Sequence, residues 1–288
     1  MPSVYKNLDC QRMVRDRCVR RLDAWDAPHE RGEISTVAGP TSVVALGPAP
    51  TRAEPSIALV PGTNMNAALS LEIAGSLARR WHTVVFDVPG QPGLSADRRP
   101  RRGRTQWYGE WLAEALERTI RGPVVVVGHS LGGAIALSCP SPQITGRVLV
   151  SPAGLARLAV TPSVLAATVP WLARPTTTRT RRLLRHMVAP GHQVPDELTE
   201  WMTLVARCCR SSLAPMPLPP ETLAARRTST TLVATGRHDV FLPPNRIGPA
   251  TRHRLGIGLR VLDGAGHLVL DEQPGAVVDL VDEVIGAL

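Results

Sequence analysis

Residues 128–132 read Gly-His-Ser-Leu-Gly, the pattern G-x-S-x-G with Ser130 at its centre. The apolar run PVVVVG (123–128) precedes the serine, and the helix-compatible run LGGAIAL (131–137) follows it. A tight turn between a strand and a helix strains the serine backbone and leaves no room for side chains at the flanking positions, which explains the glycines. N–H groups at the start of the new helix could bind a developing oxyanion. We therefore predict that Ser130 is a nucleophile for acyl chemistry.

A serine hydroxyl needs a base to become a good nucleophile at neutral pH. His267 lies in GAGHLVLDEQP (264–274), where small residues let the loop bring the imidazole toward the serine. His238 is the main rival because it also follows an apolar run. It has no flexible loop of its own, however, so we predict that His267 is the base and His238 a loop residue.

An acid is needed to orient the imidazole of that base. The run TTLVATG (230–236) is followed closely by Asp239, which could accept a hydrogen bond from the His267 ring. Asp263 and Asp271 are the alternatives, but they lie close to His267 in sequence and at the wrong strand end. We predict that Asp239 is the acid, in the chain order Ser, Asp, His.

Apolar runs that alternate with helical patterns must position these three residues. A charged N-terminal helix and a hairpin at 34–47 come first, and the last helix spans 276–288. The remaining strands are expected at 56–62, 82–88, 123–128, 146–152, 230–236 and 259–264. Repeated strand–helix units predict an α/β fold with a doubly wound, mostly parallel sheet.

One long segment breaks the alternation. Residues 153–228 hold helix-like pieces separated by prolines, and such a segment is too long for a plain loop. We predict a helical lid there. The other predicted parts are an N-terminal helical extension (1–33) and a core formed by 34–152 and 229–288.

Residues 34–288 resemble the α/β-hydrolase fold family, in its lid-bearing serine esterase and peptidase branch. The resemblance rests on the serine motif, on the Pro61–Asn64 loop after the first core strand, and on FDVPGQPGLS (86–95), which is similar to a family turn. The family usually has histidine where this chain has Pro61. The resemblance implies that the N–H groups of Thr63 and Leu131 bind the oxyanion.

The expected activity is that of a carboxylesterase-like serine hydrolase, which cleaves an ester, thioester or related acyl bond through an acyl-enzyme on Ser130. The same triad also serves C–C bond hydrolases, lyases, acyltransferases and receptors that bind a ligand without turnover. We expect four residues to contact the substrate: Asn64, Trp201, Val240 and Leu268. The helical run DELTEWMTLVAR (196–207), which contains Trp201, either fixes the lid to the core or roofs the site.

The composition limits the kinds of binding partner that we expect for this protein. The net charge is +9, almost entirely from arginine, and arginines cluster at 98–104 and 179–185. Nucleic acid or acidic lipid could bind such clusters, but no stacking aromatics or nucleic-acid motif accompany them. We expect the protein to bind no cofactor, metal, nucleic acid or membrane, and to have no membrane-spanning segment. We expect it to be a monomer or a homodimer. Five cysteines without metal spacing, and no apolar leader, favour a cytoplasmic location.

Overall fold

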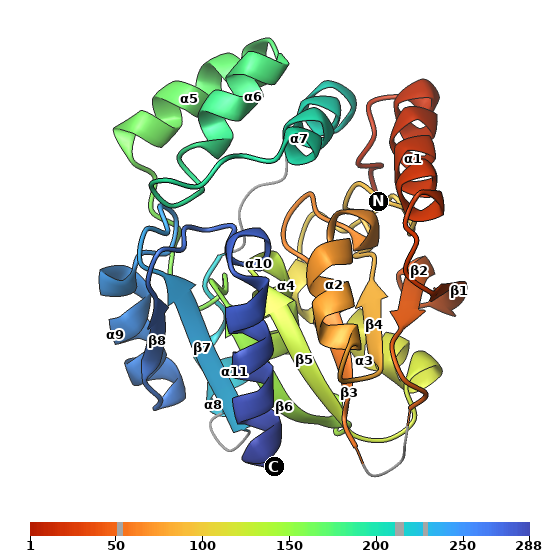
Figure 1. Cartoon of the computed structure of the whole chain (residues 1–288), viewed down its shortest axis with the longest axis vertical. Helices are drawn as coiled ribbons and strands as arrows, with labels where there is room; N and C mark the ends of the chain where they lie inside the picture. The colour runs from red at the N-terminus through yellow and green to blue at the C-terminus, as the bar shows by residue number, and fades with distance from the viewer. Residues whose placement is uncertain (51–53, 211–215, 227–229) are drawn as a thin grey trace.

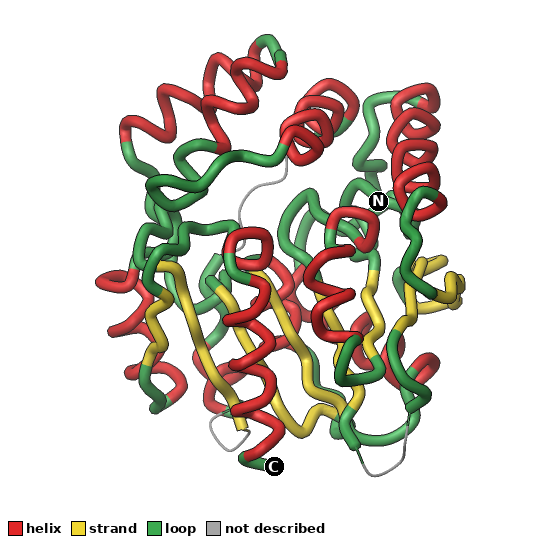
Figure 2. The backbone as a smooth tube through the Cα atoms, in the orientation of Figure 1, coloured by secondary structure: helices red, strands yellow, loops and turns green. Residues whose placement is uncertain are grey.

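The computed structural model describes residues 1–50, 54–210, 216–226 and 230–288, and its centre is one eight-stranded sheet (Figures 1 and 2). The strand order is β1-β2-β4-β3-β5-β6-β7-β8. The strands are β1 (His29–Thr36), β2 (Gly39–Leu46), β3 (Ser56–Val60), β4 (Thr83–Phe86), β5 (Val124–His129), β6 (Ile144–Val150), β7 (Thr230–Gly236) and β8 (Leu259–Leu262). Strand β2 pairs antiparallel with β1 and also antiparallel with β4. All other neighbouring strands of the sheet are parallel. The predicted fold class is confirmed.

The middle of the sheet is covered on both faces. Every residue of β5 is buried, as expected for an uninterrupted valine run in a parallel sheet. Helices α2 (Leu71–Ala78) and α11 (Pro274–Gly286) pack on one face, toward the viewer in Figure 1. The opposite face is covered by α3 (Arg104–Thr119), α4 (Leu131–Ser138), α8 (Pro220–Ala224) and α9 (Pro244–Leu255).

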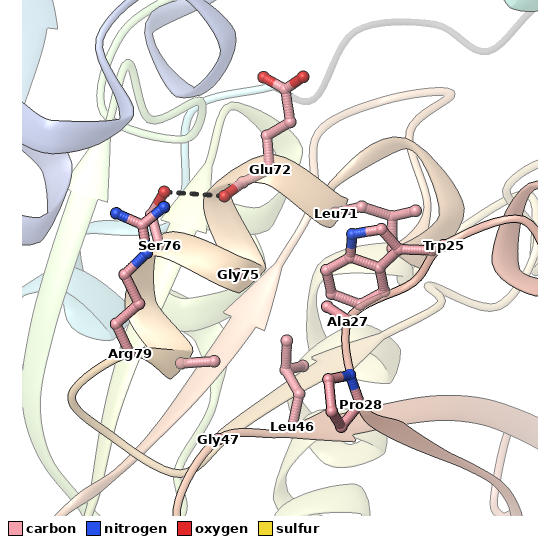
Figure 3. Close-up of a pocket in the computed structure, with 11 residues that line it drawn as sticks. Trp25, Ala27, Pro28, Leu46, Gly47, Leu71, Glu72, Gly75, Ser76 and Arg79 are labelled. Carbon is pink, nitrogen blue, oxygen red and sulfur yellow. Dashed lines mark hydrogen bonds between the residues drawn. The ribbon is translucent and has the colours of Figure 1, made fainter.

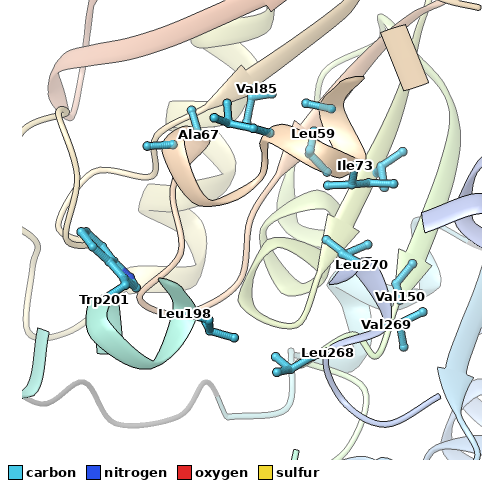
Figure 4. Close-up of a cluster of buried hydrophobic side chains, with 14 of the residues drawn as sticks. Leu59, Ala67, Ile73, Val85, Val150, Leu198, Trp201, Leu268, Val269 and Leu270 are labelled. Carbon is cyan, nitrogen blue, oxygen red and sulfur yellow. The ribbon is translucent and has the colours of Figure 1, made fainter. Parts of the chain in front are cut away.

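The segment predicted as a lid contains helices α5 (Pro162–Ala173), α6 (Thr177–Leu184) and α7 (Asp196–Cys208), followed by α8. The first three lie beyond the carboxyl ends of the parallel strands, at the top of Figure 1. Figure 4 shows Leu198 and Trp201 of α7 in the same buried cluster as Leu268, near the end of the core. The predicted lid boundary at 228–229 lies outside the described residues.

The N-terminal segment contacts both helix α7 and the core turn at 86–95. Helix α1 (Leu8–Asp23) packs against α7, and Arg17 and Arg21 form ion pairs with Glu200 and Glu197 of that helix. Before the helix, Val4 and Tyr5 are buried, and the Tyr5 hydroxyl donates to the Gly93 carbonyl at 3.0 Å. The Lys6 ammonium donates to carbonyls at the end of α7. The segment therefore connects the core turn at 86–95 with α7.

In the described part of the chain, no helix is both long enough and apolar enough to span a bilayer.

Candidate functional site

Ser130 lies in a sharp turn between β5 and α4. Its backbone has φ 49° and ψ −110°, which is uncommon for a residue with a side chain. The surrounding chain holds this conformation: the Ser130 N–H donates to the Val150 carbonyl at 3.1 Å, and the Ser130 carbonyl accepts from the Ala153 N–H at 2.9 Å. Such backbone strain, which costs about 1–3 kcal/mol, persists only where neighbouring contacts over-determine it.

The glycines around Ser130 are required by close backbone contacts. A Cβ on Gly132 would lie 1.9 Å from the Val60 carbonyl oxygen, and one on Gly128 would lie 2.6 Å from the Gly132 oxygen. A Cβ on Gly133 would lie 2.5 Å from the Cβ of Pro152. Helix α4 can therefore approach the sheet only as a glycine-rich segment, and this approach sets the position of Ser130.

His267 and Asp239 form a direct pair. His267 Nδ1 lies 2.8 Å from Asp239 Oδ2, and both side chains are buried. The other carboxylate oxygen accepts N–H groups of Phe241 and Leu242 at 2.8 and 2.9 Å. Burial alone would raise the pKa of Asp239, but the His267 charge and these hydrogen bonds outweigh it and hold the pKa well below its usual range. Asp239 therefore stays ionised, and because Nδ1 of His267 is engaged by it, Nε2 is the ring nitrogen that remains for another partner.

His129 links the turn of Ser130 to the loop of His267. Burial, and next the neighbouring His267, lower the pKa of His129 to about 4, so its ring is neutral near pH 7. Its Nε2 lies 2.8 Å from the His267 carbonyl oxygen and donates to it. The two imidazole rings lie 5.2 Å apart. Among the described residues no hydrogen bond joins the Ser130 hydroxyl to the His267 ring. In ligand-free enzymes this contact often tightens only when substrate binds.

The loop after β3 lies beside Ser130. A Cβ on Gly62 would lie 3.4 Å from Ser130 Cβ and 2.9 Å from His129 Nδ1, so glycine is needed there. Thr63 follows directly. Within the described chain, no acceptor is bound to the N–H of Thr63 or Leu131, so both predicted oxyanion donors remain available.

Asn64 is fixed in the left-handed region, with φ 64°. Its N–H donates to Gln91 Oε1 at 3.0 Å, and its carbonyl accepts the Trp201 indole N–H at 2.7 Å. Trp201 is only 1% exposed. Helix α7 therefore supports the loop that carries Thr63. Of the other residues expected to contact substrate, Leu268 is buried, and Asn64 and Val240 are partly exposed.

Glu272 is a residue that the sequence reasoning missed. It ends α10 (Val269–Glu272), and its side chain is 3% exposed. One carboxylate oxygen accepts the Gly266 N–H at 2.8 Å, and the other accepts the Ala189 N–H at 2.6 Å. The His267 N–H donates to the Met187 carbonyl at 2.7 Å. Glu272 thus ties the loop of His267 to the α6–α7 connection. Its place five residues after His267 is the only local signal for this role.

The alternatives weighed for the base and the acid lie elsewhere. His238 is exposed, and Asp263 forms a surface ion pair with Arg237. Asp271 lines a hollow of about 70 Å³ together with Glu72. Burial, followed by the charges of Glu72 and Glu272, raises the pKa of Asp271 to about 7.

A second hollow, of about 530 Å³, lies between α2 and the segment after α1 (Figure 3). Trp25, Leu46, Glu72 and Arg79 are among its lining residues, and none of the predicted catalytic residues takes part. Among the described residues, no group of three or more His, Cys, Asp or Glu side chains could hold a metal ion.

Comparison with known proteins identifies the family and the fold. The family model described as Alpha/beta hydrolase family matches residues 57–280. Lipase LipV of Mycobacterium tuberculosis is 30% identical over 241 residues, which cover 72% of this chain and 88% of that protein. Two solved structures from Bacillus subtilis have the same fold. A putative hydrolase gives a TM-score of 0.78 at 19% sequence identity, over 96% of this chain and 99% of that one. Naproxen esterase gives a TM-score of 0.75 at 19% identity, over 98% of this chain and 99% of that one. The chain belongs to the alpha/beta hydrolase family.

Proposed function

We propose that this protein is a serine hydrolase that cleaves carboxylic esters through an acyl-enzyme on Ser130. The observation that carries the proposal is the buried His267–Asp239 pair, whose loop is hydrogen-bonded through His129 to the strained turn of Ser130. The family membership and the printed activities of relatives, lipase and esterase, support the same reaction class.

In the proposed reaction, Ser130 Oγ attacks the ester carbonyl while His267 Nε2 takes the hydroxyl proton. The N–H groups of Leu131 and Thr63 donate to the oxyanion that forms. His267 then returns the proton to the leaving alcohol, and the acyl group stays on Ser130. Water attacks this ester while His267 Nε2 takes its proton, and His267 then gives that proton to Ser130 Oγ as the acyl–oxygen bond breaks and the acid leaves. Asp239 stays ionised throughout and stabilises the imidazolium.

We also propose that residues 153–228 act as a lid. Two of its segments support the site directly: Trp201 binds the carbonyl of Asn64, and Met187 binds the N–H of His267. Substrate contacts are proposed for the partly exposed Asn64 and Val240, and for Leu268 at the start of α10. Because the Trp201 indole N–H is already engaged, Trp201 would act chiefly on the oxyanion loop.

The test is turnover of p-nitrophenyl esters together with labelling by a fluorophosphonate. Ser130→Ala should remove labelling and lower kcat by at least about 10³-fold. Ser138→Ala in α4 is the matched control, since its hydroxyl only donates to the Ala134 carbonyl, and it should keep near-normal activity. Labelling of Ser130 without turnover of any ester would point to a ligand receptor instead. Equal turnover by Ser130→Ala and the original chain would exclude the proposal.

A further inference from the structure

Helix α5 has an outer face that nothing in the described chain covers. Its inner side packs through Val164, Ala167 and Trp171, and the Trp171 indole donates to Thr180 Oγ1 of α6 at 3.0 Å. The helix contains no charged residue. On its outer side Leu165 and Val169, one turn apart, are 51% and 57% exposed. This arrangement gives a continuous apolar stripe toward solvent.

This stripe differs from the ordinary scatter of exposed apolar side chains. Of the eleven large hydrophobic side chains exposed in the described chain, four lie on α5 or two residues before it: Val160, Leu165, Val169 and Leu172. These four side chains lie on or just before one helix at the outer edge of the molecule (Figures 1 and 2), and exposed apolar patches are typical of interaction surfaces.

The segment of sequence that contains α5 carries charged residues of one sign only. Residues 151–195 contain no aspartate or glutamate and six arginines: Arg157, Arg174, Arg179, Arg181, Arg182 and Arg185. Arg181 pairs with Asp196 of α7, and the Arg179 guanidinium donates to the Pro170 and Arg174 carbonyls. Arg174 and Arg182 are exposed, and neither forms an ion pair with any described residue.

The excess of arginine decides between occupants of this face. A second copy of the chain would present the same surface, and a symmetric dimer would bring like charges together. A layer of anionic phospholipid offers apolar acyl chains to the stripe and phosphate oxygens to the guanidinium groups. We propose that α5, together with Arg174 and Arg182, adsorbs the protein onto anionic lipid surfaces. No spanning helix is needed for such adsorption, and the proposal goes beyond the hydrolysis reaction and does not depend on it.

The test is flotation with phosphatidylcholine vesicles that either contain or lack phosphatidylglycerol. The Ser130→Ala chain is used so that no lipid is consumed. Binding is expected only with phosphatidylglycerol, and added salt should weaken it. Arg174→Gln with Arg182→Gln should lower the partition coefficient by about 30-fold, since each arginine near an anionic surface contributes about fivefold. Leu165→Ser with Val169→Ser should also lower it.

Matched controls test the surface itself. Val37→Ser removes an equally exposed apolar side chain at the β1–β2 turn, and Arg101→Gln with Arg102→Gln removes two exposed arginines elsewhere. These variants should bind vesicles as the parent does. Equal binding to both kinds of vesicle, or equal losses in the control variants, would overturn the proposal. A second result would also overturn the proposal: no vesicle binding, together with a dimer in light scattering that dissociates when Leu165→Ser and Val169→Ser are introduced.

Discussion

Glu272 provides the sharpest test of how the proposed base, His267, is held in place. Its buried carboxylate accepts the Gly266 and Ala189 N–H groups, one on each oxygen. Glu272→Gln keeps the shape but replaces one acceptor by an N–H₂ group that faces an N–H donor. We expect the loop of His267 to shift and kcat to fall by about 10- to 100-fold, because misplacement of a catalytic group by about 1 Å costs a factor of this size. KM should change much less.

The stability effect follows from the same two contacts. A hydrogen bond to a charged group contributes about 1.5–3 kcal/mol, and an unsatisfied buried donor costs a further 1–3 kcal/mol. Part of this loss is regained when the loop relaxes, so the expected decrease is about 2–4 kcal/mol. For a chain of this size that corresponds to a fall in Tm of roughly 3–7 °C.

The assay combines steady-state kinetics on a p-nitrophenyl ester with a thermal melt. Asp271→Asn is the matched control, because it removes a carboxylate from the adjacent residue, and no described N–H donates to that side chain. If both variants lose activity equally, the negative charge matters and the two hydrogen bonds do not. Glu272→Gln with unchanged kcat and Tm would refute the positioning role.

Three further outcomes can be measured. Asp271→Asn should raise Tm at pH 8 and leave it nearly unchanged at pH 4. The pKa of Asp271 in the folded protein, about 7, lies above its ordinary value, so a destabilising negative charge develops as the pH rises from that ordinary value to about 7. An equal effect of the substitution at pH 4 and pH 8 would contradict this. Trp201→Phe should lower kcat by about 3- to 10-fold and lower Tm by a few degrees, because it removes the hydrogen bond to the Asn64 carbonyl and leaves a small cavity at a buried position. Unchanged kcat would argue against support of the Thr63–Asn64 loop by α7. Gly132→Ala should prevent normal folding, judged by circular dichroism and yield, because its Cβ would lie 1.9 Å from a carbonyl oxygen; a Tm equal to that of the parent would show that α4 can move.

The sheet could be predicted because its signals are local. Runs such as PVVVVG carry their own burial pattern, and the small residues around Ser130 and His267 mark places where the backbone must turn tightly. Asp239 followed from the order of the strands. The hairpin was also expected, although β1 begins at His29, five residues earlier than predicted, because its first half is exposed and lacks an apolar pattern.

What escaped prediction depends on contacts between distant residues. The bond from Glu272 to the Ala189 N–H spans 83 positions, and the bond from His129 to the His267 carbonyl spans 138. Neither residue has a neighbourhood in sequence that reveals its partner. The role of Trp201 was ambiguous for the same reason: helical spacing shows that it is buried, but its contact with Asn64 is set by how α7 rests on the core.

The N-terminal segment has a consequence for biosynthesis. The Lys6 ammonium donates to the carbonyls of Ala206 and Arg207, which lie 200 and 201 positions later in the sequence. These contacts cannot form until α7 has been translated. At about 5–20 residues per second, this delay is roughly 10–40 s. Until then Val4 and Tyr5, both buried in the finished protein, lack the backbone contacts that they make with Arg210 and Cys209. Docking of residues 4–6 onto the end of α7 is therefore a late step of synthesis, and its timing should depend on the rate of elongation through α7.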